Sequence, residues 1–293
     1  MGTGSGTMDR RRRARVIAGG VGWLLAIAAA VACAPVASPA AVAANGADGP
    51  PSDARILSAY YGLAALPAHA SLACLRRVTG EDGMPVTFSV QHDAATVTPD
   101  AFAVETATGE LVTPLCATLR PATEPLERRT VLLAGPFGTP DAPPRAVVVG
   151  GGLADAAGRS LVGFRSDAIT PLEAGPSLVL AERFDPDTVG LTGECLTGTQ
   201  QVVQLVWEGG VTGPQDAALG EPQRLGVRVA LEDGAVVAPV TLADDDPDNF
   251  VLACLGTAVP ARSVAVDAGL FFDPGDDPNP ATRVEVVTGG GVD

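Results

Sequence analysis

The chain contains two histidines, His69 and His92, and imidazole is the side chain most often used as a general acid or base near neutral pH. His69 follows a proline and an alanine, and His92 precedes an aspartate, so both are predicted to lie in loops. A Ser–His–Asp arrangement could be drawn from either one, but no Gly-x-Ser-x-Gly turn accompanies them to present a nucleophilic serine. The sequence therefore indicates exposed loop histidines rather than a catalytic base.

Two clusters of acidic residues, at 244–248 and 273–277, are the other candidates for chemistry. The carboxylates of Asp244, Asp246 and Asp248 alternate along the chain, and such a set can surround Ca²⁺, a hard ion that takes about six to eight oxygen ligands. The EF-hand pattern is not met, because asparagine stands where its glycine is required and leucine where its bidentate glutamate belongs. The alternative is a solvated acidic loop, and no cofactor other than this Ca²⁺ is expected.

The first 44 residues predict a secretory signal peptide with its cleavage region. Arginines between positions 10 and 15 form a basic segment, Val16–Ala32 is an apolar run, and small residues suited to cleavage follow, among them Ala41–Ala43. The run is at the lower limit of membrane-spanning length and contains three glycines, so we favour a signal peptide over a membrane-spanning helix. The mature chain is therefore expected to be exported.

Cys33 directly follows the apolar run and could be the lipid-attachment site of a lipoprotein. Small residues precede it, although Ala30 stands where leucine is usual in such signals. The alternative is cleavage near Ala43 or Ala44, which would leave Cys33 in the removed segment. The protein would be anchored on the outer face of the cell membrane in the first case, through a flexible tether that includes residues 45–54, and secreted in the second.

Four more cysteines lie in the body of the chain and indicate disulfides. They form no C-x-x-C pair, so zinc or thioredoxin-like chemistry is not expected. Four cysteines allow three connectivities, and because two fall in each half we favour Cys74–Cys116 and Cys195–Cys254. Each bridge would contribute about 4 kcal/mol in the chain-entropy model.

The charge of the chain limits its partners. All 19 basic residues are arginines, against 34 acidic residues, and the formal net charge is −15. Removing residues 1–44 takes away five arginines and one aspartate, which makes the charge −19. Such an acidic surface disfavours nucleic acid and anionic lipid as partners. Membrane contact is expected only through a lipid on Cys33, and the oligomeric state is not predicted.

Alternation of apolar and polar residues with a period of two dominates the chain after the signal and predicts an all-β fold. Turns rich in proline and glycine separate the short runs. The strands expected in the first half are Val86–Val90, Phe102–Thr106, Leu111–Cys116, Thr130–Leu133 and Arg145–Val149. Those expected in the second half are Ser177–Ala181, Val203–Trp207 with Trp207 on its buried face, Leu225–Leu231, Ala235–Leu242, Phe250–Leu252, Ser263–Val266 and Arg283–Val287.

Proline and glycine bracket residues 168–176, which predicts a linker between two domains. We expect β-sandwiches at 55–167 and 177–288, preceded by the tether at 45–54 and followed by a disordered tail at 289–293.

The stretch 86–163 resembles the bacterial immunoglobulin-like domains of surface-layer and other cell-surface proteins. Three pieces carry the resemblance: the opening strand with Phe102–Val104 after it, the strand Thr130–Leu133, and the closing Leu153–Gly158, which is close to the Leu-x-Asp-x-Ala-Gly turn that ends such domains. Cys116 departs from the pattern. The resemblance implies a β-sandwich and no catalytic residues, and we extend the same fold to the second half as a tandem Ig-like sandwich.

These observations favour a non-enzymatic exported protein with a binding, adhesion or structural role at the cell envelope or after secretion. The alternative is a secreted hydrolase or carbohydrate-active accessory protein whose loop carboxylates supply general acid and base groups. Converging carboxylates in a concave pocket would distinguish the second from the first.

Overall fold

The structure is a computed structural model that describes residues 54–188, 191, 195–243 and 248–289. Contacts divide the chain into Met1–Ala44 and a second compact unit, Asn45–Asp293. The predicted signal peptide and Cys33, the tether apart from Ala54, and the tail after Gly289 lie outside the described residues. In the described ranges no helix is both long and apolar enough to cross a membrane.

The described chain is built mostly of β-strands, which confirms the expected all-β class at this coarse level. Its α-helices are short: α1 (Ala70–Ala73) and α2 (Glu221–Gly226). Period-two alternation accounts for many strands, as in β3 (Phe102–Glu105), whose residues are alternately buried and half-buried.

The first β region contains two antiparallel four-stranded sheets. One has the order β1-β2-β6-β5, with β1 (Ile56–Ala59), β2 (Asp82–Phe88), β6 (Thr130–Gly135) and β5 (Cys116–Thr118). The other has the order β4-β3-β7-β8, with β4 (Leu111–Val112), β7 (Ala146–Val149) and β8 (Arg165–Ser166) beside β3.

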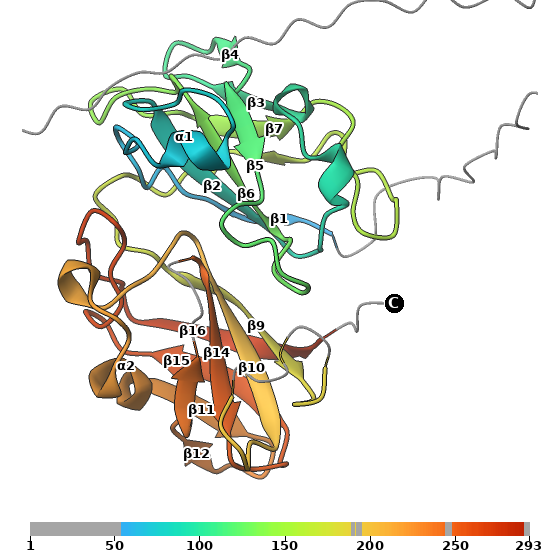
Figure 1. The fold of residues 1–293 in the computed structure, drawn as a ribbon, viewed down its shortest axis with the longest axis vertical. Coiled ribbons are helices and arrows are strands. Elements are labelled where there is room, and N and C mark those ends of the chain that lie inside the picture. The colour runs from blue at the N-terminus through green and yellow to red at the C-terminus, as the bar shows by residue number, and fades with distance from the viewer. Residues whose placement is uncertain (1–53, 189–190, 192–194, 244–247, 290–293) are drawn as a thin grey trace, which may run out of the picture. The chain divides into compact units, whose positions relative to one another are not determined.

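A single apolar core lies between these two sheets, which face each other in Figure 1. Val86 and Phe88 of β2 and Leu133 of β6 enter it from one side, and Val104 of β3 and Val147 of β7 from the other. Their near-complete burial removes large apolar side chains from water, the main stabilising term of such a fold.

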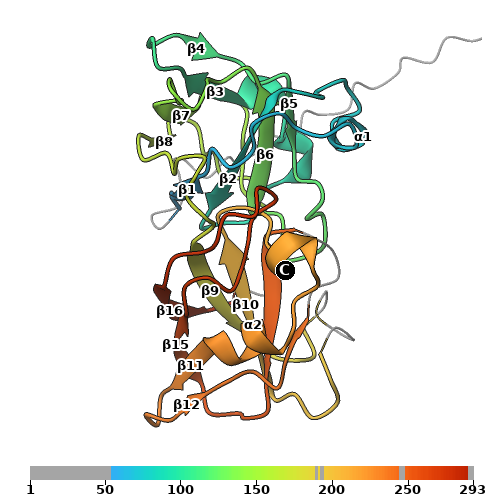
Figure 2. The same ribbon diagram turned by 90° about the vertical axis from the view of Figure 1, so that its left-hand side faces the viewer.

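The second β region contains one eight-stranded sheet, in the order β12-β11-β15-β16-β9-β10-β14-β13. Its strands are β9 (Leu178–Phe184), β10 (Gln201–Trp207), β11 (Val227–Leu231), β12 (Val236–Val237), β13 (Thr241–Ala243), β14 (Phe250–Leu255), β15 (Ala261–Val266) and β16 (Thr282–Thr288). All pairings are antiparallel except that of β16 with β9, where the sheet joins its two halves (Figure 2).

The core of the second region lies between those two halves of the sheet. Val203, Leu205 and Trp207 of β10 face it, as alternation predicts, and the Trp207 ring packs against Phe271 with 4.5 Å between centroids. The opposite face of β10 is also buried, including Gln204. Because the core of the second region covers only one face of β10, another segment of the chain must cover the opposite face.

Three expected strands differ from the structure. The run Leu111–Cys116 is divided between β4 and β5, which belong to different sheets. The run Leu225–Leu231 is a strand only from Val227, because residues 221–226 form α2. The run Ala235–Leu242 is divided between β12 and β13, which pair with β11 and β14 respectively. Pro239 lies between them, and proline cannot donate a ladder hydrogen bond.

The segment 168–176, expected to be a linker, is hydrogen-bonded to the first β region. The Tyr61 amide donates to the Thr170 carbonyl and the Thr170 amide donates to the Ala59 carbonyl, both at 2.9 Å. At Gly175 a side chain would overlap the carbonyl of Pro278. The division into two domains remains a prediction, while residues 45–293 form one compact unit.

Candidate functional site

The outer face of β9, β10 and β14 is covered by a strap, which we define as residues 119–129 between β5 and β6. Leu126 of the strap is buried among Phe184, Val202 and Leu252. Ala122 packs in a second small cluster, whose other members are Leu180, Val206, Phe250 and, at its margin, Leu57. The strap explains why β10 is buried on both faces. We call this contact between the two β regions the joint.

A buried ion pair closes the joint. Arg129, the last residue of the strap, donates through Nη2 to Glu182 of β9, and both side chains are almost fully buried. Arg129 also donates through Nη1 to the Ser89 carbonyl at 2.8 Å. Burial lowers the pKa of Arg129, and the adjacent Glu182 carboxylate opposes that shift. Because each charge is buried, removing either partner would leave the other uncompensated.

Other side-chain hydrogen bonds also connect the two β regions. Asn249 Nδ2 donates to Thr130 Oγ1 at 2.8 Å, and the Tyr60 hydroxyl lies 2.7 Å from Asp273 Oδ2. Near the start of the second region, Thr170 Oγ1 donates to Glu208 Oε1, also at 2.8 Å. Burial, with the Asp273 hydrogen bond, raises the pKa of Tyr60 and keeps its hydroxyl protonated as the donor. The joint therefore combines the apolar contacts of the strap with polar contacts between the two β regions.

A shallow hollow of about 220 Å³ opens beside the ion pair. The residues that line it are Ser89, Val90, Gln91, Arg129, Asp155, Ala156, Ala157, Arg159 and Glu182. Both arginines are already paired, Arg159 through Nε with Asp155 Oδ2 at 2.8 Å. The other oxygen of Asp155 accepts the amides of Ala157 and Arg159. The hollow thus brings together complementary charges that are already paired with one another.

The prediction for His92 is wrong. His92 is 2% exposed, and its ring packs edge-on against Phe88 with 4.5 Å between centroids. Burial, with repulsion from Arg129, lowers its pKa to about 4, and Asp155 acts in the opposite direction. The imidazole is therefore neutral at pH 7 and is part of the interior beneath the joint. His69 is exposed, as predicted.

The calcium ligands expected from the sequence are only partly within the described residues. Asp244 and Asp246 lie outside them, and Asp248 is buried, with Oδ1 accepting the Phe250 amide at 2.6 Å. Asp248 therefore does not belong to a solvated loop. In the described ranges no group of three His, Cys, Asp or Glu side chains is arranged to hold a metal ion.

The acidic cluster at 273–277 organises its own loop. Asp273 Oδ1 accepts the amides of Gly275 and Asp277, at 2.9 and 2.8 Å, while Oδ2 lies against the Tyr60 hydroxyl. Desolvation, followed by repulsion from Asp273, Glu173 and Asp276, raises the pKa of Asp277. Asp273 therefore stabilises its own turn through Oδ1 and contributes to the joint through Oδ2.

The disulfides join Cys74 to Cys116 and Cys195 to Cys254, with Cα–Cα distances of 5.7 and 5.8 Å. These are the pairs favoured from the sequence. Each lies within one β region, so neither crosses the joint. Disulfides persist in oxidising compartments, and the protein is accordingly extracytoplasmic.

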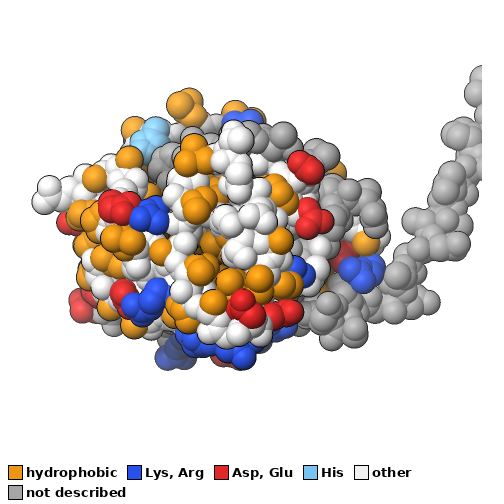
Figure 3. Space-filling model, turned by 90° about the horizontal axis from the view of Figure 1, so that it is seen from below, with side chains coloured by type: hydrophobic (Ala, Val, Ile, Leu, Met, Phe, Trp, Pro, Cys, Tyr) orange, Lys and Arg blue, Asp and Glu red, His pale blue; other side chains and the backbone are white. Residues whose placement is uncertain are grey.

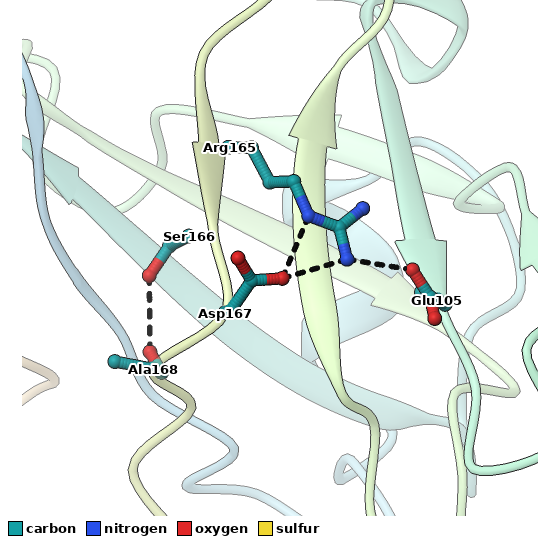
Figure 4. Close-up of polar contacts among 5 residues, drawn as sticks. All are labelled: Glu105, Arg165, Ser166, Asp167 and Ala168. Atoms are coloured by element: carbon teal, nitrogen blue, oxygen red, sulfur yellow. Dashed lines mark hydrogen bonds and ion pairs between the residues drawn. The ribbon is translucent and has the colours of Figure 1, made fainter.

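The exposed charges form local ion pairs. Arg165 of β8 contacts Glu105 of β3 and its neighbour Asp167, at 2.7 and 2.6 Å (Figure 4). Hydrogen bonds from Arg165 to these two carboxylates raise its pKa. Figure 3 shows acidic, basic and hydrophobic side chains interspersed on one face of the molecule.

Comparisons with known proteins give no family assignment. No protein-family model matches the sequence, and no curated protein matches it. Among solved structures, the N-terminal part of the bacterial S-layer protein SbsC is similar to 80% of this chain, at 15% identity and with a TM-score of 0.25. The match covers 44% of the SbsC chain. Likeness at this level carries no argument about function, so the described site rests on its own geometry.

Proposed function

We propose that the protein is an exported, non-enzymatic component of the cell envelope or of the secreted fraction, with a structural, adhesive or binding role. In this proposal the two β regions are tandem Ig-like sandwiches. The observation that carries it is the joint: a strap from the first region that covers one face of the second, and the buried Arg129–Glu182 ion pair at the end of that strap. A protein that presents a surface at a fixed geometry needs such a rigid connection, whereas independently moving modules do not.

The disulfides support the same role. Each closes a loop within one β region, at sequence separations of 42 and 59 residues, and such bridges stabilise small domains outside the cytoplasm. Together with the joint they would give a unit that resists unfolding outside the cytoplasm.

The hydrolase alternative requires carboxylates that converge on a pocket and are available for proton transfer. In the described part of the chain, Asp155 and Asp273 instead accept backbone amides, and Glu182 is paired with Arg129. No observation on these residues favours the hydrolase, and it stays untested.

Cell fractionation with protease shaving tests the proposal. We expect the protein in the envelope or culture medium, accessible to added protease on intact cells, and pelleting with isolated envelope fragments when it is anchored. Cys33→Ser should move an acylated protein from the membrane fraction to the medium, while a mature N-terminus near Asn45 would exclude the lipoprotein. Recovery of the folded protein in the cytoplasm, or turnover of a glycan or ester substrate at an enzymatic rate, would contradict the proposal.

A further inference from the structure

The short helix α1 and the turn that follows it expose two leucines to solvent. Leu72 is 74% exposed and Leu75 is 86% exposed, and the Leu75 amide donates to the Leu72 carbonyl, so both belong to one turn. We define the leucine–arginine turn as residues 69–77. Single exposed leucines are common on protein surfaces, but two within one turn form a compact apolar projection.

The charge around these leucines is opposite to that of the rest of the protein. Residues 54–80 contain no aspartate or glutamate, the longest such stretch in the described chain, although the protein has 34 acidic residues. Arg76 and Arg77 follow Leu75 directly, and both are exposed, as is His69 at the other end of the turn. The turn is therefore a cationic and apolar patch on an acidic protein.

The fold holds this turn in place. Cys74, between the leucines, is bonded to Cys116 of β5, and Arg76 Nη1 donates to the Leu115 carbonyl at 3.1 Å. The Val78 amide donates to Ser71 Oγ. Leu75 has a φ of +48°, a left-handed conformation that a bulky side chain adopts only when its surroundings impose it. An exposed leucine held in an unfavourable backbone conformation does not by itself stabilise the folded state.

We propose that the leucine–arginine turn docks on an anionic phospholipid surface, with the leucines entering the interfacial region and the arginines contacting phosphates. Guanidinium groups match phosphate oxygens in charge and geometry, and apolar side chains beside a basic cluster are the usual composition of interfacial membrane contacts. This inference rests on the proposed function, because the turn would meet a membrane surface in the cell only if the protein is exported as proposed above.

A lipid surface fits the turn better than a protein partner does. Leu72 belongs to α1, which stands at the margin of the first β region in Figure 2, and Leu75 follows that helix. A protein would need a matching pocket for both leucines. A bilayer interface adapts to such a projection. The overall negative charge does not prevent the contact, because charges more than about 10 Å away are screened at moderate ionic strength.

Vesicle co-sedimentation tests the proposal with the compact unit from Asn45 onward, disulfides formed, so that neither the apolar run nor Cys33 contributes. We expect binding to phosphatidylglycerol vesicles, weaker binding to phosphatidylcholine vesicles, and a further loss in high salt. Leu72→Ser with Leu75→Ser should weaken binding at least about tenfold, and Arg76→Gln with Arg77→Gln roughly tenfold. Val236→Ser and Arg145→Gln, exposed residues elsewhere, are the matched controls and should leave binding unchanged.

Leu75→Trp provides an independent readout, because Trp207 is the only tryptophan of residues 45–293 and is fully buried. Its emission should shift to the blue on phosphatidylglycerol vesicles if residue 75 enters the interface. Equal binding to both lipids, insensitivity to the leucine substitutions, or no spectral shift would overturn the proposal. Tight binding to polyglutamate that ignores the leucine substitutions would also overturn it and would indicate an acidic polypeptide partner. A protein that fails on vesicles yet fractionates with the envelope would refute this inference alone.

Discussion

Two clusters built from the same kinds of residue differ in almost every physical respect. At the joint, Arg129 and Glu182 form an ion pair whose side chains are only 4% and 9% exposed. On the outer sheet of the first β region, Arg165 bridges Glu105 and Asp167 while its side chain remains 40% exposed. An exposed pair gains little because water screens it and long side chains lose rotamer freedom, whereas a buried pair is expensive to break. The comparison predicts that identical substitutions will have very different consequences.

Glu182→Gln should cause the largest loss of stability, about 3–5 kcal/mol, because it leaves the buried Arg129 guanidinium without its counterion. Urea unfolding at pH 7 measures it. Glu105→Gln, which removes a carboxylate from the exposed cluster, is the matched control. A Glu182→Gln variant as stable as this control would show that the joint pair is not buried in solution.

His92 extends the comparison to imidazoles. Its pKa in the folded protein is about 4, below the ordinary value, so above pH 6.5 both folded and unfolded states are neutral. As the pH falls from about 6.5 to 4, the unfolded state binds a proton that the folded state does not, and stability decreases by about 3 kcal/mol. His92→Leu should remove this part of the pH dependence.

The measurement is the difference in unfolding free energy between wild type and variant at several pH values, which cancels the titration of the carboxylates. His69→Leu, at the exposed histidine, should leave the pH profile of the wild type intact. Parallel profiles for wild type and His92→Leu would contradict the buried, neutral imidazole.

Leu126→Ala tests the apolar half of the joint. The side chain is 2% exposed between Phe184, Val202 and Leu252, and truncation should cost about 2–3 kcal/mol. Leu111→Ala, at a leucine that is 59% exposed, should be nearly neutral in the same thermal or urea unfolding experiment. Equal losses at the two positions would mean that the strap does not cover β10.

Arg165→Gln should have the smallest effect, with a melting temperature indistinguishable from that of the wild type, because the side chain is solvated whether or not its partners are present. A marked loss of stability would erase the contrast between the two clusters.

Much of the strand content could be predicted from the sequence. The turn Glu232–Gly234 is one example, since Asp233 accepts the Ala235 amide, Gly234 has a positive φ, and β11 and β12 pair as a hairpin. Local alternation and turn chemistry determine such elements, so short-range patterns reveal them. The cysteine pairs also follow the division of the chain into halves.

The joint could not be predicted, because it is formed by residues far apart in the sequence. Arg129 and Glu182 are 53 positions apart, and no local sequence pattern at either residue identifies the other as its partner. Two signals were present: a glutamate directly after the apolar start of β9, and apolar residues on both faces of β10. His92 was misjudged for the same reason, since the neighbours in its buried environment include Arg129 and Asp155, which lie far from it in the sequence.

Differential scanning calorimetry tests the central claim, that the joint makes the two β regions one cooperative unit. For residues 45–293 with disulfides formed, we predict a single transition whose calorimetric and van't Hoff enthalpies agree, and its division into two transitions when Glu182→Gln is combined with Leu126→Ala. Two separate transitions in the unmodified protein at pH 7 would contradict the claim.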